Sequence, residues 1–249
     1  MPLIIPANTL ASSFEIDNSC IFAASDSDYM HKTPSSAGNR QKFTLATWVK
    51  RNSTGSQMIF SAGSNENNVA YLQFTSGNEL AFEEYDNNTD FALKTNATYT
   101  DTSVWYHIVA AVDTTQSTDT NRIKIYVDGT LITSLARSVY PSENYSGLVN
   151  TTIAHRVGRF GWNANLYFNG LMSEFVFIDG VQHDVTDFGK FDGSTWKPID
   201  VSGLTAGTNN GFYLDFKASG NLGNDVFGGT DLTEVNIVAG NQSTDTPTS

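Results

Sequence analysis

The chain has 249 residues and a formal net charge of −12 at pH 7, and only 16% of its residues are charged. A charge of this sign repels phosphate backbones and anionic lipid, which argues against nucleic acid and a membrane surface as partners. The single cysteine, Cys20, excludes an intrachain disulfide, and we expect it to be a small buried hydrophobic residue.

The N-terminal residues 1–19 predict an extended arm. They contain Pro2 and Pro6 but no lysine or arginine, so they do not resemble a secretory signal. No window of the chain approaches the ~18 consecutive apolar residues of a membrane span. We therefore expect a soluble chain whose arm serves as a contact segment.

Short strand patterns then follow one another without room for helices. After a first strand at 20–23 and a polar loop to residue 42, they recur at 43–49, 57–61, 69–75, 79–84 and 91–95. The intervening turns are rich in Gly, Asn and Asp, as hairpins require. This spacing predicts an antiparallel meander.

The middle of the chain continues the pattern. Residues 104–112 are apolar on both faces and predict a central strand. Residues 122–135 predict a hairpin, with Ile123, Ile125 and Val127 on one face before a turn at Asp128-Gly129. We expect 136–150 to be an irregular crossing connection and 151–158 to be a further strand.

Residues 167–180 predict the strand around which the others are organised. The turn dipeptides Asn169-Gly170 and Asp179-Gly180 flank it. Strict alternation would place four residues on one face, namely Leu171, Ser173, Phe175 and Phe177. The opposite face would carry Met172, Glu174, Val176 and Ile178.

The last part of the chain predicts one helical turn capped by Asp184, an extended segment at 196–200 and a strand in 210–220. In that strand Phe212, Leu214 and Phe216 share a face. The fold class is therefore an all-β, two-sheet antiparallel sandwich of jelly-roll type. We expect residues 1–19 to form an extended arm, 20–220 the sandwich, and 221–249 a C-terminal arm packed on or beyond it.

Four segments in this order resemble a known family, namely FTLATWVKR, WYHIVAAVD, RIKIYVDGTLI and FNGLMSEFVFIDG. They are similar to the laminin-G-like or concanavalin-A-like jelly roll over about residues 20–180. The chain also resembles the version of this domain in structural proteins of marine tailed phages. That resemblance adds IIPANTLASSFEIDNS, DYMHKTPSSAGNR, FGKFDGSTWKP, NGFYLDF, LGND and the closing DTPT.

The resemblance implies a sandwich displayed on the virion surface as a fibre, spike or capsid decoration. Its partners would be other capsid or tail proteins, further copies of the chain, and a host-surface glycan. Because the fold also hosts lectins and enzymes, each chemistry must be sought in the residues themselves.

Glycoside hydrolysis needs two carboxylates at a defined separation. Glu84 and Asp86 share a strand face, but Asn87 and Asn88 follow where a second glutamate would be required. A solvated hairpin end is the expected role of this segment. The four histidines lie far apart, and no zinc pattern or serine-nucleophile motif occurs. We therefore expect no enzyme activity.

Two kinds of binding site remain open. A calcium ion needs six to eight oxygen ligands, and Asp113, Asp119 and Asn121 lie in one loop that could supply some of them; a plain polar loop is the alternative. No other cofactor is expected.

A glycan site needs an exposed aromatic ring beside hydrogen-bonding side chains. The candidates are Trp162 with Asn163 and Asn165, and then Tyr85 with Asp86. Trp48 and Trp105 lie within strand patterns and are expected in the core. The leading hypothesis is a non-enzymatic virion structural protein that attaches through its arms. The alternative is a carbohydrate-binding lectin or receptor-binding module.

Overall fold

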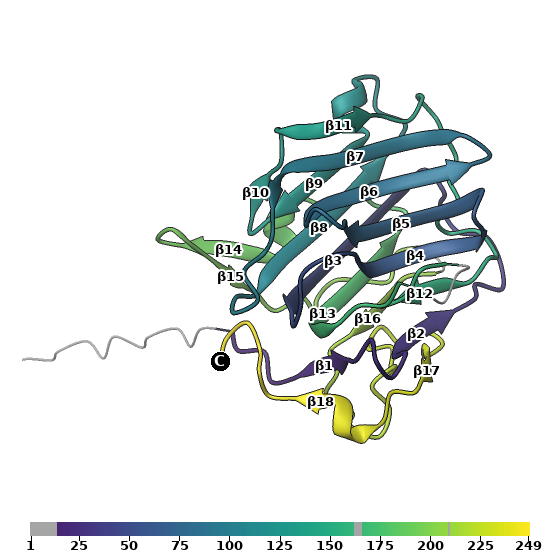
Figure 1. The fold of residues 1–249 in the computed structure, drawn as a ribbon. Coiled ribbons are helices and arrows are strands. Elements are labelled where there is room, and N and C mark those ends of the chain that lie inside the picture. The colour runs from purple at the N-terminus through teal and green to yellow at the C-terminus, as the bar shows by residue number, and fades with distance from the viewer. Residues whose placement is uncertain (1–13, 162–165, 209) are drawn as a thin grey trace, which may run out of the picture.

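The computed structural model describes residues 14–161, 166–208 and 210–249. Two antiparallel β-sheets face each other, and their inner sides enclose one hydrophobic core (Figure 1). This arrangement confirms the predicted two-sheet sandwich. Within the described ranges no helix is long and apolar enough to cross a membrane.

Sheet A carries the strand on which the prediction centred. In spatial order its strands are β10 (Thr130–Leu131), β9 (Ile123–Val127), β8 (Tyr106–Asp113), β3 (Lys42–Arg51), β13 (Gly170–Asp179), β1 (Ser19–Phe22) and β18 (Gln242–Ser243), and β16 (Phe212–Leu214) also pairs with β13.

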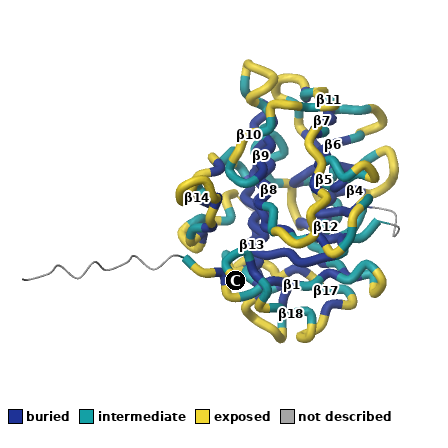
Figure 2. The backbone as a smooth tube through the Cα atoms, turned by 60° about the vertical axis from the view of Figure 1, so that its left-hand side comes forward, coloured by how far each residue is buried: buried dark blue, intermediate teal, exposed yellow. Residues whose placement is uncertain are grey.

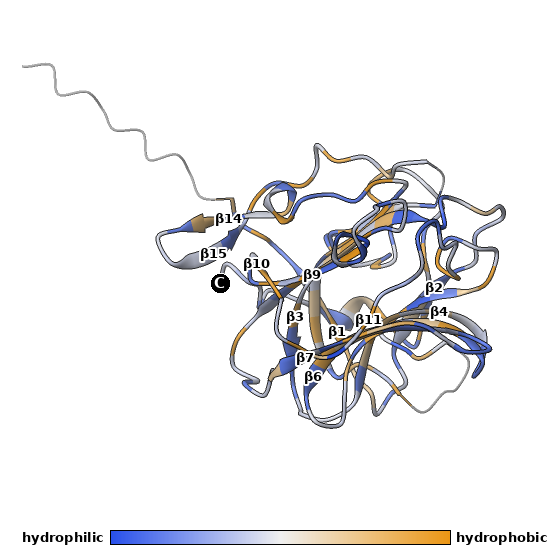
Figure 3. Ribbon diagram, turned by 90° about the horizontal axis from the view of Figure 1, so that it is seen from above, coloured by the Kyte–Doolittle hydropathy of each residue, from blue (hydrophilic) through white to orange (hydrophobic). Residues whose placement is uncertain are grey.

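Sheet B contains the predicted meander. Its strands in spatial order are β11 (Leu135–Val139), β7 (Thr89–Thr98), β6 (Glu79–Asp86), β5 (Asn68–Phe74), β4 (Gln57–Asn65), β12 (His155–Val157), β2 (Tyr29–Lys32) and β17 (Thr233–Val235). Seen from above, β4, β6 and β7 form one layer, and β3 and β9 of sheet A lie beside it (Figure 3).

The remaining elements are short. They are the hairpin β14 (Gly189–Asp192) and β15 (Thr195–Pro198), and the single 3-10 turns η1 (Asp119–Asn121), η2 (Val185–Asp187) and η3 (Ala239–Asn241). The predicted helical turn is η2, and the Asp184 side chain caps it by accepting from the Thr186 N–H at 3.0 Å. The segment predicted as an irregular crossing differs in part, because β11 occupies its first residues and pairs with β7.

The core contains the faces that simple alternation predicts on β9 and β16. Ile123, Ile125 and Val127 all lie in it, and the turn after them has Asp128 at φ 47° and Gly129 at φ 76°. Cys20 is fully buried there. Figure 2 shows the buried strands β8, β9 and β13 running through the middle of the molecule.

The predicted faces of β13 are wrong in the first half of the strand. The pairing of β13 with β3 shifts register between Ser173 and Val176, and Glu174 has φ 49°. A bulge inserts one extra residue and reverses the phase of the side chains beyond it. Met172, rather than Leu171, therefore shares the core with Phe175 and Phe177.

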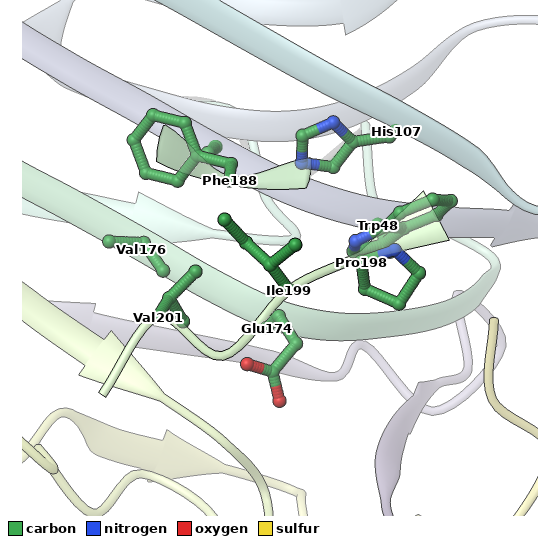
Figure 4. A pocket seen from close by; sticks show the side chains of 9 residues that line it. Trp48, His107, Glu174, Val176, Phe188, Pro198, Ile199 and Val201 are labelled. Carbon is green, nitrogen blue, oxygen red and sulfur yellow. The ribbon is translucent and has the colours of Figure 1, made fainter. Parts of the chain in front are cut away.

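A third layer covers the outer face of sheet A. Residues 185–201 bring Val185, Phe188, Trp196 and Val201 onto a second hydrophobic cluster that includes the buried Trp48. Figure 4 shows Phe188, Pro198, Ile199 and Val201 lying close to His107 and Trp48. The cavity left between them is about 10 Å³, which is room for about one water molecule.

His107 is held within this third layer. Its Nδ1 accepts a hydrogen bond from the Trp196 Nε1–H at 3.0 Å, so a neighbouring side chain satisfies the histidine. Burial lowers the pKa of His107 to about 3, and the ring is therefore neutral. Trp105 differs from its predicted core position, because it is half-buried and its Nε1–H donates to Asp245 at 3.1 Å.

The two ends of the described chain lie side by side. β18 pairs with β1 in sheet A, and β17 pairs with β2 in sheet B. The backbone N–H of Ile16 donates to the Thr248 hydroxyl at 2.9 Å. Residues 233–243 thus contribute edge strands to both sheets, and the division into arm, sandwich and arm stays a prediction.

Candidate functional site

The outer face of sheet B carries a continuous row of side chains across all eight strands. The pairing registers place in this row Val139, Ala92, Glu83, Tyr71, Ser61, Arg156, His31 and Thr233. Their neighbours along the strands, such as Leu72 and Phe82, lie in the core. Successive residues of a strand point to opposite faces, so the row faces away from the core.

Three aromatic rings gather at the centre of this face. Tyr71 and Tyr85 are stacked, with centroids 6.3 Å apart and an interplanar angle of 15°. Phe160 meets Tyr71 edge-on at 5.4 Å. All three side chains are half-buried, so each ring is held by its neighbours and still reaches solvent.

A charged pair borders these rings. The Tyr71 hydroxyl donates to Glu83 Oε2 at 2.7 Å, and Arg137 Nη1 lies 3.5 Å from Glu83 Oε1. Arg137 Nη1 also donates to the Tyr85 hydroxyl at 3.1 Å. Together Tyr71, Tyr85, Phe160, Glu83 and Arg137 form what we call the Tyr71 cluster.

The surroundings of Tyr71 keep its hydroxyl protonated. Burial and the neighbouring Glu83 carboxylate raise the pKa of Tyr71. The hydrogen bond to Tyr85 raises the pKa of Arg137, which therefore stays charged. The cluster thus presents flat apolar rings beside one cation and one carboxylate group.

The adjacent Glu84 does not join Glu83 on this face. Its Oε1 accepts from the Tyr145 hydroxyl at 2.7 Å and from the Leu148 N–H at 2.9 Å, and its side chain is buried under that loop. Glycoside hydrolysis needs two carboxyl groups facing the same bond. Glu83 and Glu84 do not meet that requirement.

A groove of about 600 Å³ lies at the end of the row. Its lining residues are His31, Lys32, Thr33, Pro34, Ser35, Asn210, Gly229, Thr230, Asp231 and Thr233. His31 and Thr233 belong to the row, so the groove adjoins the outer face of sheet B. Hydroxyl and amide groups make up much of its wall.

The sequence-predicted glycan residues fall into two groups. Trp162, Asn163 and Asn165 lie outside the described residues. Tyr85 lies in the Tyr71 cluster, whereas Asp86 is exposed at the end of β6, where its Oδ1 accepts from Asn87 at 3.1 Å.

The predicted calcium residues differ in their burial and in their partners. Asp113 is buried and bonded to Thr115 and Gln116, and Lys42 lies 3.2 Å from it. Asp119 and Asn121 are exposed in η1. No group of three or more His, Cys, Asp or Glu in the described ranges is arranged to hold a metal ion. Calcium binding by this loop stays a prediction.

Sequence reasoning missed Tyr71, Glu83, Arg137 and Phe160 as site residues. Each comes from a different strand or loop, and only the sheet register brings them together. The outward positions of the 69–75 and 79–84 strands could have identified Tyr71 and Glu83, because they alternate with core residues.

A protein-family comparison gives a match over residues 25–183. The matching family model is described as the concanavalin A-like lectin/glucanases superfamily. The match covers more than half of the chain and includes every residue of the Tyr71 cluster. No curated protein matches the chain.

Solved structures share the fold at low sequence identity. A proposed carbohydrate binding protein from Bacteroides ovatus is 16% identical, with a TM-score of 0.54 over 95% of this chain and 62% of that protein. Domains LG4-5 of the mouse laminin alpha1 chain are 14% identical, with a TM-score of 0.47 over 73% and 47%. Tailspike protein 2 of Escherichia coli O157:H7 bacteriophage CAB120 is 13% identical, with a TM-score of 0.43 over 73% and 28%. The chain spans less than two thirds of each of these proteins.

Proposed function

Because the chain belongs to the concanavalin A-like lectin/glucanase superfamily, we propose that it is a non-catalytic glycan-binding module that uses the outer face of sheet B. The observation that carries this proposal is the Tyr71 cluster, where three half-exposed aromatic rings lie beside a Glu83–Arg137 pair. Aromatic faces pack against the C–H faces of sugar rings, while charged groups hydrogen-bond their hydroxyls.

The same cluster favours binding over hydrolysis. Glu83 is engaged by Arg137 and Tyr71, and its neighbour Glu84 is turned into the protein. The Bacteroides ovatus structure with the same fold is a proposed carbohydrate binding protein, which is consistent with this function. The outer face of sheet A is covered by the third layer, whereas Tyr71 and Tyr85 on the outer face of sheet B are half-buried and reach solvent.

Removing the central ring tests the proposal. We expect Tyr71→Ala to weaken glycan binding by roughly tenfold to hundredfold, or ~1.4–2.7 kcal/mol, because it deletes the ring that contacts both Tyr85 and Phe160. Tyr71→Phe keeps the ring and should retain most of the affinity. The measurement is a glycan array followed by calorimetric titration of the best ligand.

The control is Phe191→Ala, which removes a 53% exposed ring from the β14–β15 hairpin, away from sheet B. If Tyr71→Ala binds as tightly as the unmodified protein, or if Phe191→Ala loses as much affinity, the assigned face is wrong. Release of reducing sugar from a bound glycan would contradict the non-catalytic assignment. Trp162→Ala tests separately the glycan contact that the sequence predicts for its loop.

We further propose that the module is carried on the surface of a phage particle as a structural component. The resemblance of its terminal segments to phage structural proteins supports this, as does a surface with few charged residues. We expect the protein to co-sediment with purified particles, through contacts with capsid or tail proteins. A trimer by light scattering would favour a fibre, and a monomer a decoration. Absence of the protein from washed particles would contradict this placement.

A further inference from the structure

Two arginines without acidic partners lie on the outer face of sheet B beside the Tyr71 cluster. Arg156 and Arg159 take part in none of the ion pairs formed among the described residues. The chain has 26 acidic and only 14 basic residues. On composition alone, two neighbouring arginines without an acidic ion-pair partner are therefore unexpected. Like charges placed together repel, and the arrangement needs a physical reason.

His31 lies next to these two arginines on the same face. It pairs with Arg156 across β2 and β12, and both side chains face outward in the row. Burial and the two nearby arginines lower the pKa of His31, so its ring is neutral near pH 7 and offers an N–H donor rather than a charge. Burial and Arg159 likewise lower the pKa of Arg156.

The arginine side chains are held in place with part of their donor capacity unused. Arg156 Nη1 donates to the carbonyls of Gly63 and Ala154 at 3.2 and 3.3 Å. The Arg159 guanidinium lies 4.7 Å from the centroid of the Tyr29 ring, and its buried Nε has no hydrogen-bond partner within the described part of the chain. A guanidinium lying over an aromatic ring keeps its N–H edge available for an oxyanion.

Arg156 and Tyr71 lie in the same row across sheet B. Arg156, Ser61 and Tyr71 are neighbours on β12, β4 and β5. Two strand intervals correspond to roughly 10 Å, so one oligosaccharide can reach both groups. Beyond Arg156 the row runs through His31 into the hydroxyl-lined groove of about 600 Å³.

We propose that Arg156 and Arg159, supported by His31, form an anion subsite of the glycan-binding face, and that the ligand is therefore an acidic glycan. The inference rests on the proposed function and specifies its ligand class. The ligand would carry an oxyanion on a sugar, either a carboxylate or a sulfate. The arginine guanidinium binds such a group through paired N–H donors. The aromatic rings of the Tyr71 cluster hold the adjoining sugar.

The test compares oligosaccharides of matched length by calorimetric titration: a carboxylated oligogalacturonate, a sulfated agaro-oligosaccharide and neutral cello-oligosaccharide. At least one acidic ligand is expected to bind about tenfold or more tightly than the neutral one, since a charge-assisted pair contributes roughly that factor. The preferred acidic ligand identifies the anion. The preference should fall as NaCl is raised to about 1 M, where the Debye length is ~3 Å.

Variants of the two arginines distinguish the contribution of their positive charge from that of the guanidinium geometry. The double variant Arg156→Gln/Arg159→Gln should bind the acidic ligand no more tightly than the neutral one. The double variant Arg156→Lys/Arg159→Lys should have an intermediate affinity for the acidic ligand. It keeps both positive charges, so it still tests the site if the glutamine variant does not fold. Lys190→Gln with Lys197→Gln makes the same change in net charge on the exposed β14–β15 hairpin and should have no effect.

Equal affinity for acidic and neutral glycans, with Tyr71→Ala still weakened, would overturn the anion subsite and leave the proposed function intact. Acidic preference that survives in the folded Arg156→Gln/Arg159→Gln protein would overturn it as well. Failure of all three ligand classes to bind would overturn both proposals.

Discussion

Replacing Arg51 with leucine is expected to lower the free energy of unfolding by about 3–5 kcal/mol, a large fraction of the stability of an ordinary domain. Arg51 is fully buried at the end of β3. Its Nη1 donates to the Tyr99 carbonyl at 2.6 Å and to Asn78 Oδ1 at 3.1 Å, and its Nη2 donates to the Gly55 carbonyl at 2.6 Å.

The expected loss of stability in Arg51→Leu comes from the buried groups that the guanidinium contacts. The guanidinium lies 4.3 Å from the centroid of the Phe74 ring, so the charge is stabilised by a ring and by three oxygens rather than by an acid. Leucine removes the donors and leaves the oxygens in place, at about 1–3 kcal/mol for each one that stays unsatisfied. These contacts also connect sheet A to the turns of sheet B.

Urea unfolding followed by circular dichroism measures this effect. Lys50→Leu is the control, because it removes the same charge one position away at a residue that forms a partly exposed ion pair with Asp245. Such pairs contribute about 0–1 kcal/mol. A loss below ~1 kcal/mol in Arg51→Leu would show that the buried oxygens find other donors.

The second large effect is the loss of stability that two buried glutamates contribute as pH rises from about 5 to about 7, which glutamine variants isolate. Burial raises the pKa of both Glu84 and Glu174 to about 7. In the unfolded chain these groups release their protons near pH ~4.3. From there to pH ~7 the native state binds more protons than the unfolded state, so stability falls as pH rises.

The histidines act in the opposite direction at lower pH. Burial lowers the pKa of His107 to about 3 and that of His155 to about 4, so their contribution grows as pH rises to ~6.5 and is constant above it. A pH scan of the unmodified protein alone would mix the two effects. Comparison with glutamine variants removes the histidine contribution.

We therefore expect Glu84→Gln and Glu174→Gln each to gain stability relative to the unmodified protein between pH 5 and pH 8, by on the order of 2–3 kcal/mol. Glutamine keeps an acceptor for the Tyr145 hydroxyl that Glu84 now binds and for the Tyr213 hydroxyl that Glu174 binds. Glu143→Gln, at an exposed position, controls for the substitution itself. A stability difference that does not change with pH would mean that these carboxylates are already ionised in the folded protein.

Local chemistry was sufficient to predict most of the sandwich. The Asp128-Gly129 turn, the core face of β9 and the capped turn at Asp184 follow from backbone preferences within a few residues, and the structure confirms them. The prediction of which β13 side chains face the core failed at Glu174. The bulge there depends on the partner strand β3, which lies more than a hundred residues away in the sequence.

The third layer was missed for the same reason. Trp196 was predicted only as part of an extended segment, since nothing near it in sequence indicates that it covers His107. Of the Tyr71 cluster, Tyr85 was predicted because Asp86, Asn87 and Asn88 follow it in the sequence. Arg137 was not found, because it reaches Glu83 only through the pairing of β11 with β7 and of β7 with β6.

Because the outer face of sheet A is covered, strong attachment to a surface would require several copies of the protein. With one sheet capped by residues 185–201, the proposed glycan-binding face lies on one side of each copy only. A single free copy would therefore make only one contact with a glycan surface. Copies fixed side by side on one particle would bind a repetitive surface at several points at once. Each added contact is then made at the high effective concentration that tethering creates, so avidity can exceed the strength of one contact by about 10²–10⁴.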